Sequence, residues 1–240
     1  MRVGVQLIVW GERNRTDRAA VLGEVAAAGY DAVEMSPPAD ADAAAEDLRR
    51  SGLRVVASHI NTGRLEADLD NHVRWLERHG ATLMACSGSD YPTSAQFREV
   101  ARRLDRAGAR CREHGIRLCY HNHAHEIMHD MFGLGHILAA TDPQNVRLNV
   151  DTYWVARGGQ DPAAVIRLLK DRVGYLHLKD MLPDGSFGEV GAGVLDWAAI
   201  RAAADDAGVD VCVVEQDRTA RTPQESSAMS RTYLRERWGV

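Results

Sequence analysis

The segment IRLCYHNH (residues 116–123) is an apolar run about one β-strand long that leads into side chains able to bind ligands. Seven similar runs occur in the chain, each followed by a longer stretch with the apolar spacing of an amphipathic helix. Several of these stretches end in glycine, which readily adopts the left-handed conformation that stops a helix. The eight runs that predict strands are 3–10, 31–36, 53–60, 82–88, 116–123, 146–151, 173–180 and 209–217.

Strands that are apolar throughout indicate burial on both faces, as in a parallel sheet. Eight units in 240 residues average 30 residues each, which fits a (β/α)8 barrel, an architecture of about 250 residues. The sequence therefore predicts the α/β class and a TIM barrel that forms one domain over residues 1–240. A doubly wound open sheet is the alternative, but the sequence has no Gly-rich fingerprint after its first strand.

Composition and charge exclude several classes of protein. Hydrophobic residues make up 45% and charged residues 26% of the chain, as in an ordinary soluble protein. The net charge of −5 and the lack of a basic stripe argue against nucleic acid as a partner. The N-terminal segment MRVGVQLIVWG is too short for a bilayer, which takes ~20 apolar residues, so no membrane association is expected. The four cysteines lack metal-site or disulfide spacing, which favours a cytoplasmic protein.

Side chains that can bind ligands gather at one end of the predicted strands. Active sites of (β/α)8 barrels form where the carboxyl ends of the strands meet. The opposite ends carry no comparable set, so the convergence predicts a functional site. The residues at this rim are Glu34, His59, Asn61, His121, Asn122, His123, Asp151, His177, Lys179, Asp180 and Glu215.

Four of these residues, His121, Asp151, His177 and Glu215, follow the fifth to the eighth strand. Taken singly, such a histidine is usually a hydrogen-bonded residue and such an aspartate a helix cap. Together, two imidazoles and two carboxylates form a ligand set for one divalent metal ion. Mn²⁺, Co²⁺, Fe²⁺ and Zn²⁺ all suit this set, whereas Mg²⁺ suits two nitrogen ligands less well; we favour Mn²⁺.

Two rim residues lie two positions from a predicted ligand and share its side of the strand. His123 points to the same side as His121, where it could be a fifth ligand, a substrate contact or an acid or base. Lys179 lies on the side of His177, where it could stabilise a developing negative charge or bind a substrate hydroxyl. Its alternative is a simple ion pair with Asp180.

The loop predicted after the fifth strand gives a weaker signal. Glu126 could reach back over the barrel mouth to a substrate, or could form a salt bridge within the loop. His125 and His129 are expected to be solvated loop histidines.

Aromatic residues and a glycine-rich segment near the rim are open to two interpretations. Trp10, Tyr153 and Trp154 could form an apolar floor under a sugar or could fill the core. The segment GSFGEVGAGVLDW (185–197) follows the seventh strand, where such barrels often bind phosphate, but it contains no lysine or arginine. Asp196 within it is expected to cap the next helix.

Six motifs occur in a characteristic order: SHI (58–60), YHNHAHE (120–126), NVDTYW (149–154), HLKD (177–180), GAGVLDW (191–197) and VVEQD (213–217). In this order and spacing they resemble the xylose isomerase-like TIM barrels. This is the sugar phosphate isomerase/epimerase family, which also includes inosose dehydratases and endonuclease IV. The resemblance covers nearly the whole chain and is specific for the superfamily, while several reactions share its fold and metal site.

The resemblance implies one divalent metal held by Glu, Asp, His and Glu, which correspond here to His121, Asp151, His177 and Glu215. His121 stands where the sugar epimerases have glutamate. In those enzymes the two glutamates also transfer protons on opposite faces of the substrate, so this departure puts symmetric epimerisation in doubt. The YHNH variant is closer to the inosose dehydratase-like branch. Endonuclease IV-like members carry a larger three-zinc set, for which this chain has too few rim histidines.

These observations lead to one expected function. We expect a divalent-metal-dependent sugar isomerase or epimerase that acts on a ketose or keto-polyol through a metal-stabilised enediolate. The alternatives are a keto-sugar or inosose dehydratase, a lyase, with the same site, and a non-catalytic sugar-binding barrel. The partner is a small-molecule sugar, and the resemblance also implies a homo-oligomer. The expected catalytic residues are Glu215, His123 and Lys179, and the expected substrate contacts are His59, Glu34, Trp10, Glu126 and Trp154.

Overall fold

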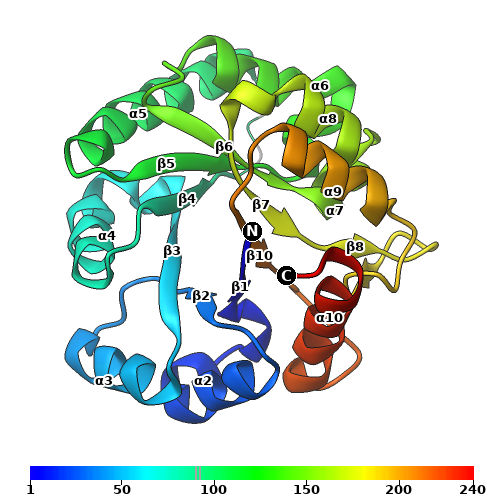
Figure 1. The fold of residues 1–240 in the computed structure, drawn as a ribbon. Coiled ribbons are helices and arrows are strands. Elements are labelled where there is room, and N and C mark those ends of the chain that lie inside the picture. The colour runs from blue at the N-terminus through cyan, green and yellow to red at the C-terminus, as the bar shows by residue number, and fades with distance from the viewer. Residues whose placement is uncertain (90, 92) are drawn as a thin grey trace.

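Eight parallel strands close into a barrel in the computed structural model, which describes residues 1–89, 91 and 93–240. Figure 1 looks along this barrel. The order around it is β1-β10-β7-β6-β5-β4-β3-β2, so the first and last barrel strands are neighbours. The predicted (β/α)8 fold is confirmed, and each of the eight predicted runs contains a barrel strand, although residues 7–10 of the first run form a short 3-10 helix instead. The strands are β1 (Arg2–Gln6), β2 (Ala32–Glu34), β3 (Arg54–Asn61), β4 (Leu83–Ser87), β5 (Arg117–His121), β6 (Val146–Asp151), β7 (Val173–Leu178) and β10 (Val211–Val214).

Helices surround the barrel as an outer layer (Figure 1). The short segments near the rim are η1 (Leu7–Trp10), α1 (Arg13–Thr16), η2 (Thr62–Arg64) and the antiparallel pair β8 (Asp180–Met181) and β9 (Phe187–Gly188), while η3 (Lys170–Arg172) precedes β7. The main helices are α2 (Arg18–Ala27), α3 (Ala41–Ser51), α4 (Leu65–His79), α5 (Ser94–Glu113), α6 (Ala124–Ala139), α7 (Thr152–Arg157), α8 (Pro162–Leu168), α9 (Trp197–Asp206) and α10 (Pro223–Trp238).

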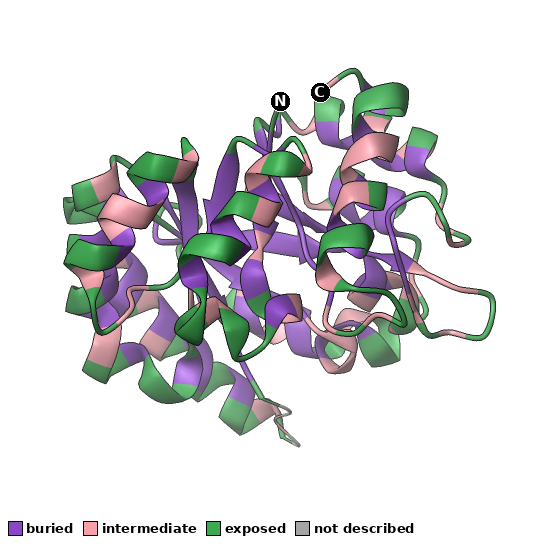
Figure 2. Cartoon of the chain, turned by 90° about the horizontal axis from the view of Figure 1, so that it is seen from below, coloured by how far each residue is buried: buried purple, intermediate pink, exposed green. Residues whose placement is uncertain are grey.

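The core has two parts because each strand is buried on both faces. Figure 2 shows the strands buried and the outer helix faces exposed. One apolar cluster packs the helices onto the outside of the barrel. A smaller one fills the barrel interior with alternate side chains of the strands, as in other (β/α)8 barrels. The interior cluster consists of Ala32, Val56, Ala57, Leu83, Ala85, Cys119, Tyr175, Val211 and Val213.

Helix ends follow the predicted glycines. Gly52 and Gly80 take the left-handed conformation directly after α3 and α4, which returns the chain to the next strand. All four cysteines are buried within the fold. In the part of the chain that the structure describes, every helix is too short or too polar to cross a membrane.

The segment after β5 differs from its prediction. His125 and His129 were expected in a loop, but α6 already begins at Ala124. This helix is broken where His129, Asp130 and Met131 all have positive φ angles of 54–61°. The expectation is wrong for His125, because His123 and Glu126 form a capping box that starts the helix, a signal that serine or threonine usually gives. It agrees with the structure for His129, which is exposed within the non-helical break.

Candidate functional site

The four predicted metal ligands meet at the carboxyl ends of β5, β6, β7 and β10. Asp151 pairs with His177 across β6 and β7, and the main-chain N–H of Glu215 donates to β7 at Leu178. All four side chains are buried. Strand alternation sends them into the barrel mouth, where one nitrogen or oxygen of each lies within 4.8 Å of the others. The sequence therefore identified a real cluster.

The spacing of this cluster matches a coordination sphere. His121 Nε2 lies 3.5 Å from Asp151 Oδ2 and 3.6 Å from Glu215 Oε2, and His177 Nδ1 lies 3.3 Å from the same Glu215 oxygen. Ligand atoms ~2.1 Å from one tetrahedral metal ion would be roughly 3.4 Å apart. Three of the six distances between the four donor atoms therefore match such a site, and the other three are within 4.8 Å.

Three of these donor atoms lack the hydrogen bonds that buried polar atoms normally make. His121 Nε2, Asp151 Oδ2 and His177 Nδ1 are all buried without a hydrogen-bond partner, although the Lys179 ammonium forms an ion pair with this Asp151 oxygen. Such orphaned atoms cost free energy unless something else satisfies them. A divalent cation would satisfy all three at once, so this residue set fits a metal ion.

The charges at the cluster also favour a cation. Burial raises the pKa of Asp151 and of Glu215, but the Lys179 ammonium and the neighbouring histidines together outweigh burial and hold both pKa values below their usual range. Burial lowers the pKa of His177, yet the adjacent carboxylates raise it to about 10, and those beside His121 also raise its pKa. The carboxylates therefore remain ionised and draw positive charge into the centre.

Glu34 and His59 form the next layer around the cluster. Glu34 Oε2 lies 3.0 Å from His177 Nε2 and accepts a hydrogen bond of 2.7 Å from the Tyr175 hydroxyl. Its Oε1 lies 3.2 Å from His59 Nδ1, while His59 Nε2 lies 2.9 Å from Ser87 Oγ. Glu34 is only 2% exposed and orients the two imidazoles, and it also lines a cavity at this end of the barrel.

The structure adds Tyr175 and Ser87 to the predicted set. Tyr175 lies two positions before His177 on the same side of β7, and Ser87 pairs with His121 across β4 and β5. Strand parity could have indicated Tyr175. Nothing in the sequence marks Ser87, because its role depends on the register between strands.

Lys179 is fully buried among three carboxylates. Its Nζ lies 2.7 Å from Glu215 Oε2 and 3.2 Å from Asp151 Oδ2, and it also contacts Asp217, a residue that the sequence analysis missed. These carboxylates raise its pKa even though burial opposes this, so the side chain stays charged. The alternative pairing with Asp180 is wrong.

Asp180 instead organises the glycine-rich segment. Its carboxylate accepts hydrogen bonds from the main-chain N–H groups of Met181, Gly191, Gly193 and Leu195 at 2.8–3.2 Å, and from the Trp197 indole at 2.6 Å. These donors are consequently unavailable to a phosphate group, and the weak phosphate signal finds no support. The predicted cap is confirmed, because Asp196 accepts a bond from Ala199 N.

His123 and Trp154 lie beside Lys179 at the mouth. The two rings meet edge to face at 5.3 Å, and Lys179 Nζ lies 5.4 Å from the Trp154 ring centre. Burial lowers the pKa of His123 to about 3, so its imidazole is neutral near pH 7. The neighbouring Tyr153 is structural, since its hydroxyl donates to Gly185 O at 2.9 Å.

Glu126 and Trp10 were expected to contact the substrate, but both are buried and their polar atoms are hydrogen-bonded within the protein. Glu126 is fully buried and accepts hydrogen bonds from Tyr120 Oη at 2.5 Å and from His123 N at 2.8 Å, so it anchors the start of α6. Trp10 is 3% exposed, and its indole donates to Glu24 of α2 at 2.7 Å. Both are better explained as packing residues.

The candidate metal cluster of His121, Asp151, His177 and Glu215 opens to solvent through a small pocket of about 300 Å³, which we call the metal pocket. The pocket is lined by residues that the sequence predicted, by Asp217, and by residues of β1, η1 and the loop after β2. Its lining is Gln6, Ile8, Ser36, His59, Asn61, Ser87, His121, His123, Glu215 and Asp217.

The fold and this mouth define a (β/α)8 barrel with a buried His/Asp/Glu cluster that could bind a metal ion. The chain belongs to the xylose isomerase-like TIM barrel family, whose sequence profile matches residues 22–237. The resemblance predicted from the motifs is thereby confirmed.

Individual relatives agree with this assignment. An inosose dehydratase from Geobacillus kaustophilus is 26% identical, over 97% of this chain and 93% of the relative. A sugar phosphate isomerase/epimerase from Parabacteroides distasonis superposes with a TM-score of 0.83 at 22% identity, covering 98% of this chain and 94% of that one. A structure of the IOLI protein with a bound zinc atom superposes with a TM-score of 0.76 at 14% identity, covering 98% and 97%. The two structures are similar in fold.

Proposed function

We propose that this chain is a divalent-metal-dependent enzyme that removes a proton from the carbon beside the carbonyl of a ketose or keto-polyol. The observation that supports it is a set of four buried ligand atoms within 4.8 Å of one another at an open barrel mouth, three of which have no hydrogen-bond partner. Held by His121, Asp151, His177 and Glu215, a divalent ion would polarise the substrate carbonyl as a Lewis acid. The zinc atom in the IOLI protein supports a metal in this kind of barrel.

Glu215 is the proposed base. It lines the pocket and is held ionised by Lys179 and the two histidines, so its carboxylate can accept the proton. Lys179 Nζ, 2.7 Å away, balances the negative charge that develops on the substrate oxygen. Lys179 contributes to catalysis in this way without losing its own proton.

The remaining residues position the sugar. His123 has a neutral imidazole that can bind a substrate hydroxyl and act as the second proton-handling group. Both ring nitrogens of His59 already have partners, so a hydroxyl would take the place of Ser87. The half-buried ring of Trp154 offers an apolar face beside His123.

Where the proton goes next decides the reaction. If it returns at another position or face, the reaction is isomerisation or epimerisation; if a β-hydroxyl leaves instead, it is dehydration. Two observations favour dehydration as a second candidate: His121 replaces one of the paired glutamates of the epimerases, and the Geobacillus relative is an inosose dehydratase.

The test is solvent-deuterium exchange into a panel of ketoses and inososes, with Mn²⁺ added to protein stripped of metal. We expect deuterium at the carbon beside the carbonyl of at least one compound, and a strict requirement for metal. Loss of water from an inosose would assign the lyase. Exchange in no compound, together with no divalent metal above trace in elemental analysis, would favour a non-catalytic sugar-binding barrel.

A further inference from the structure

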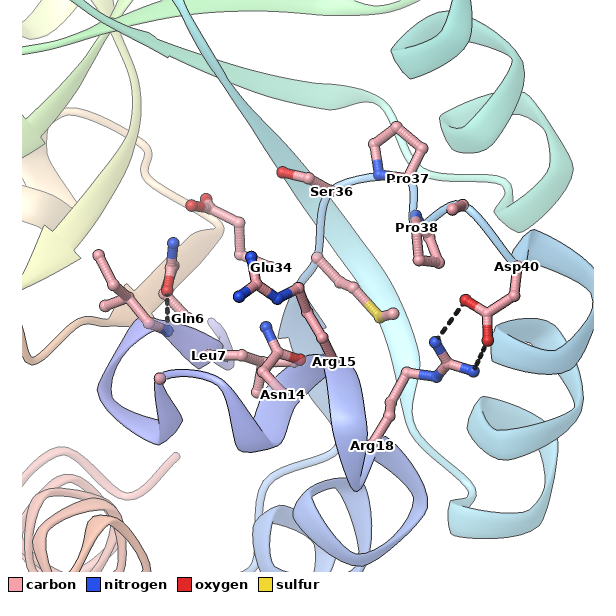
Figure 3. Close-up of a pocket in the computed structure, with 14 residues that line it drawn as sticks. Gln6, Leu7, Asn14, Arg15, Arg18, Glu34, Ser36, Pro37, Pro38 and Asp40 are labelled. Atoms are coloured by element: carbon pink, nitrogen blue, oxygen red, sulfur yellow. Dashed lines mark hydrogen bonds and ion pairs between the residues drawn. The ribbon is translucent and has the colours of Figure 1, made fainter.

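A second, larger cavity adjoins the metal pocket at the same end of the barrel. It has a volume of about 620 Å³ and lies over the ends of β1 and β2, next to α1 (Figure 3). Both cavities share Gln6, Ile8 and Ser36 as lining residues, so they are continuous. The side chain of Ile8 is 47% exposed at this junction, although it is a large apolar residue.

The larger cavity has an apolar wall, which the metal pocket lacks. Imidazoles and carboxylates line the metal pocket, whereas six rigid or apolar side chains form a wall of the larger cavity beside its polar residues. These are Leu7, Ile8, Met35, Pro37, Pro38 and Ala39. Such a wall suits an apolar group.

The charged residues of this cavity leave a single side chain free for a ligand. Arg18 lines it but is held by Asp40 at 2.8 Å and by Asp47 at 2.9 Å. Arg15 points into the cavity toward Glu34 (Figure 3), and its only described ion pair is a long one of 3.8 Å to Glu12. A planar guanidinium in this position can stack on the face of an aromatic ring.

We propose that the substrate is a keto-sugar carrying a ring-sized apolar substituent, such as an aryl glycoside, and that this substituent occupies the cavity lined by Ile8, Met35, Pro37, Pro38 and Ala39. The inference rests on the proposed function, because it assumes that the metal pocket holds the carbonyl end. A pocket of about 300 Å³ is at the lower end of the range for small-molecule sites and suits one sugar ring. The adjoining 620 Å³ is then space for whatever that ring carries.

The experiment compares methyl and phenyl 3-keto-β-D-glucopyranoside, which share the carbonyl end and differ in the substituent. We expect wild-type protein loaded with Mn²⁺ to process the phenyl compound with a kcat/KM at least about tenfold higher. Ala39 is exposed and lines the cavity, so Ala39→Trp should fill it and cancel most of this preference. Ala202→Trp, on the exposed face of α9, is the matched control and should keep it.

Calorimetric binding of both compounds separates this inference from the proposed function. If wild type binds the phenyl compound more tightly and Ala39→Trp loses this preference, the cavity binds the substituent. This holds even if deuterium exchange is absent and the proposed reaction is wrong. Equal binding and equal kcat/KM in the wild type would overturn the inference while leaving enolisation intact. It is also overturned if Ala39→Trp weakens both compounds by the same factor.

Discussion

His177 Nε2 lies 3.0 Å from Oε2 of Glu34, and this contact leaves the opposite ring nitrogen, Nδ1, facing the metal cluster. An imidazole that donates from one nitrogen presents a lone pair at the other, so Glu34 selects the tautomer that a metal requires. The Tyr175 hydroxyl fixes the same carboxylate oxygen at 2.7 Å. Glu34 is thus a positioning residue.

Replacing Glu34 by glutamine should weaken metal binding. The variant Glu34→Gln keeps the shape but removes the negative charge behind His177, and such partners typically contribute 10–100-fold to metal affinity. Competition with a chelating dye should show a Kd for Mn²⁺ raised by about that factor. Glu113→Gln, on the exposed surface of α5, should leave the Kd unchanged. An unaltered Kd in Glu34→Gln would disprove the positioning role.

Removal of the buried Lys179 ammonium should destabilise the metal-free protein. In Lys179→Met three neighbouring carboxylates lose their cation, which costs about 3–5 kcal/mol when a buried pair is broken. Urea unfolding should show this loss, and Mn²⁺ at about 100 times its Kd should return roughly 2.7 kcal/mol by mass action. If Mn²⁺ at this concentration stabilises neither Lys179→Met nor the surface control Ala202→Trp, the cluster does not bind it.

The barrel and its ligand set could be predicted because they depend on patterns that are local in sequence. Apolar runs with a repeat near 30 residues fix the fold class, and strand ends fix the rim. His121, Asp151, His177 and Glu215 then converge whatever the detailed packing is.

Roles that depend on register or on competition for hydrogen bonds could not be predicted. Glu126 and Asp180 both follow strands near the predicted rim. In the structure, Glu126 caps α6, and Asp180 accepts hydrogen bonds from five N–H groups between Met181 and Trp197. Asp217 was missed although it ends the predicted strand 209–217 two positions after Glu215, so the alternation that drew attention to His123 and Lys179 could have indicated it as well.

Acidification should destabilise the fold through His72. This residue of α4 lies 3.2 Å from Ser58 Oγ, and burial lowers its pKa from an ordinary 6.5 to about 4. Between these values the unfolded chain binds the proton more readily, so stability falls as the pH drops from about 6.5 toward 4. Wild type should lose about 2 kcal/mol more than His72→Gln in urea unfolding between pH 7.5 and pH 5. The exposed His129→Asn should behave like the wild type.

Replacing His121 by glutamate should change the preference of the site between Zn²⁺ and Mn²⁺. His121→Glu exchanges an imidazole for a harder oxygen ligand, which favours Mn²⁺ and Mg²⁺ over Zn²⁺. The ratio of the Zn²⁺ to the Mn²⁺ association constant should fall by about tenfold or more in competition titrations. His123→Glu, which alters a residue outside the proposed ligand set, should change the ratio little. If both variants change this ratio equally, the result contradicts the assignment of His121 as a metal ligand.

Replacing Glu215 by glutamine should stop proton abstraction. A positioned base contributes typically about 10²–10⁴-fold, and an amide cannot accept the proton. Because Glu215 is also a proposed ligand, exchange must be measured at saturating Mn²⁺, with the bound metal counted in the same sample. Asp217→Asn is the matched control, since Asp217 lines the same pocket and contacts Lys179 but is outside the ligand set. Deuterium exchange should fall by at least about a hundredfold in Glu215→Gln and by much less in Asp217→Asn. If exchange instead falls more in Asp217→Asn than in Glu215→Gln, with metal bound in both variants, Asp217 is the base.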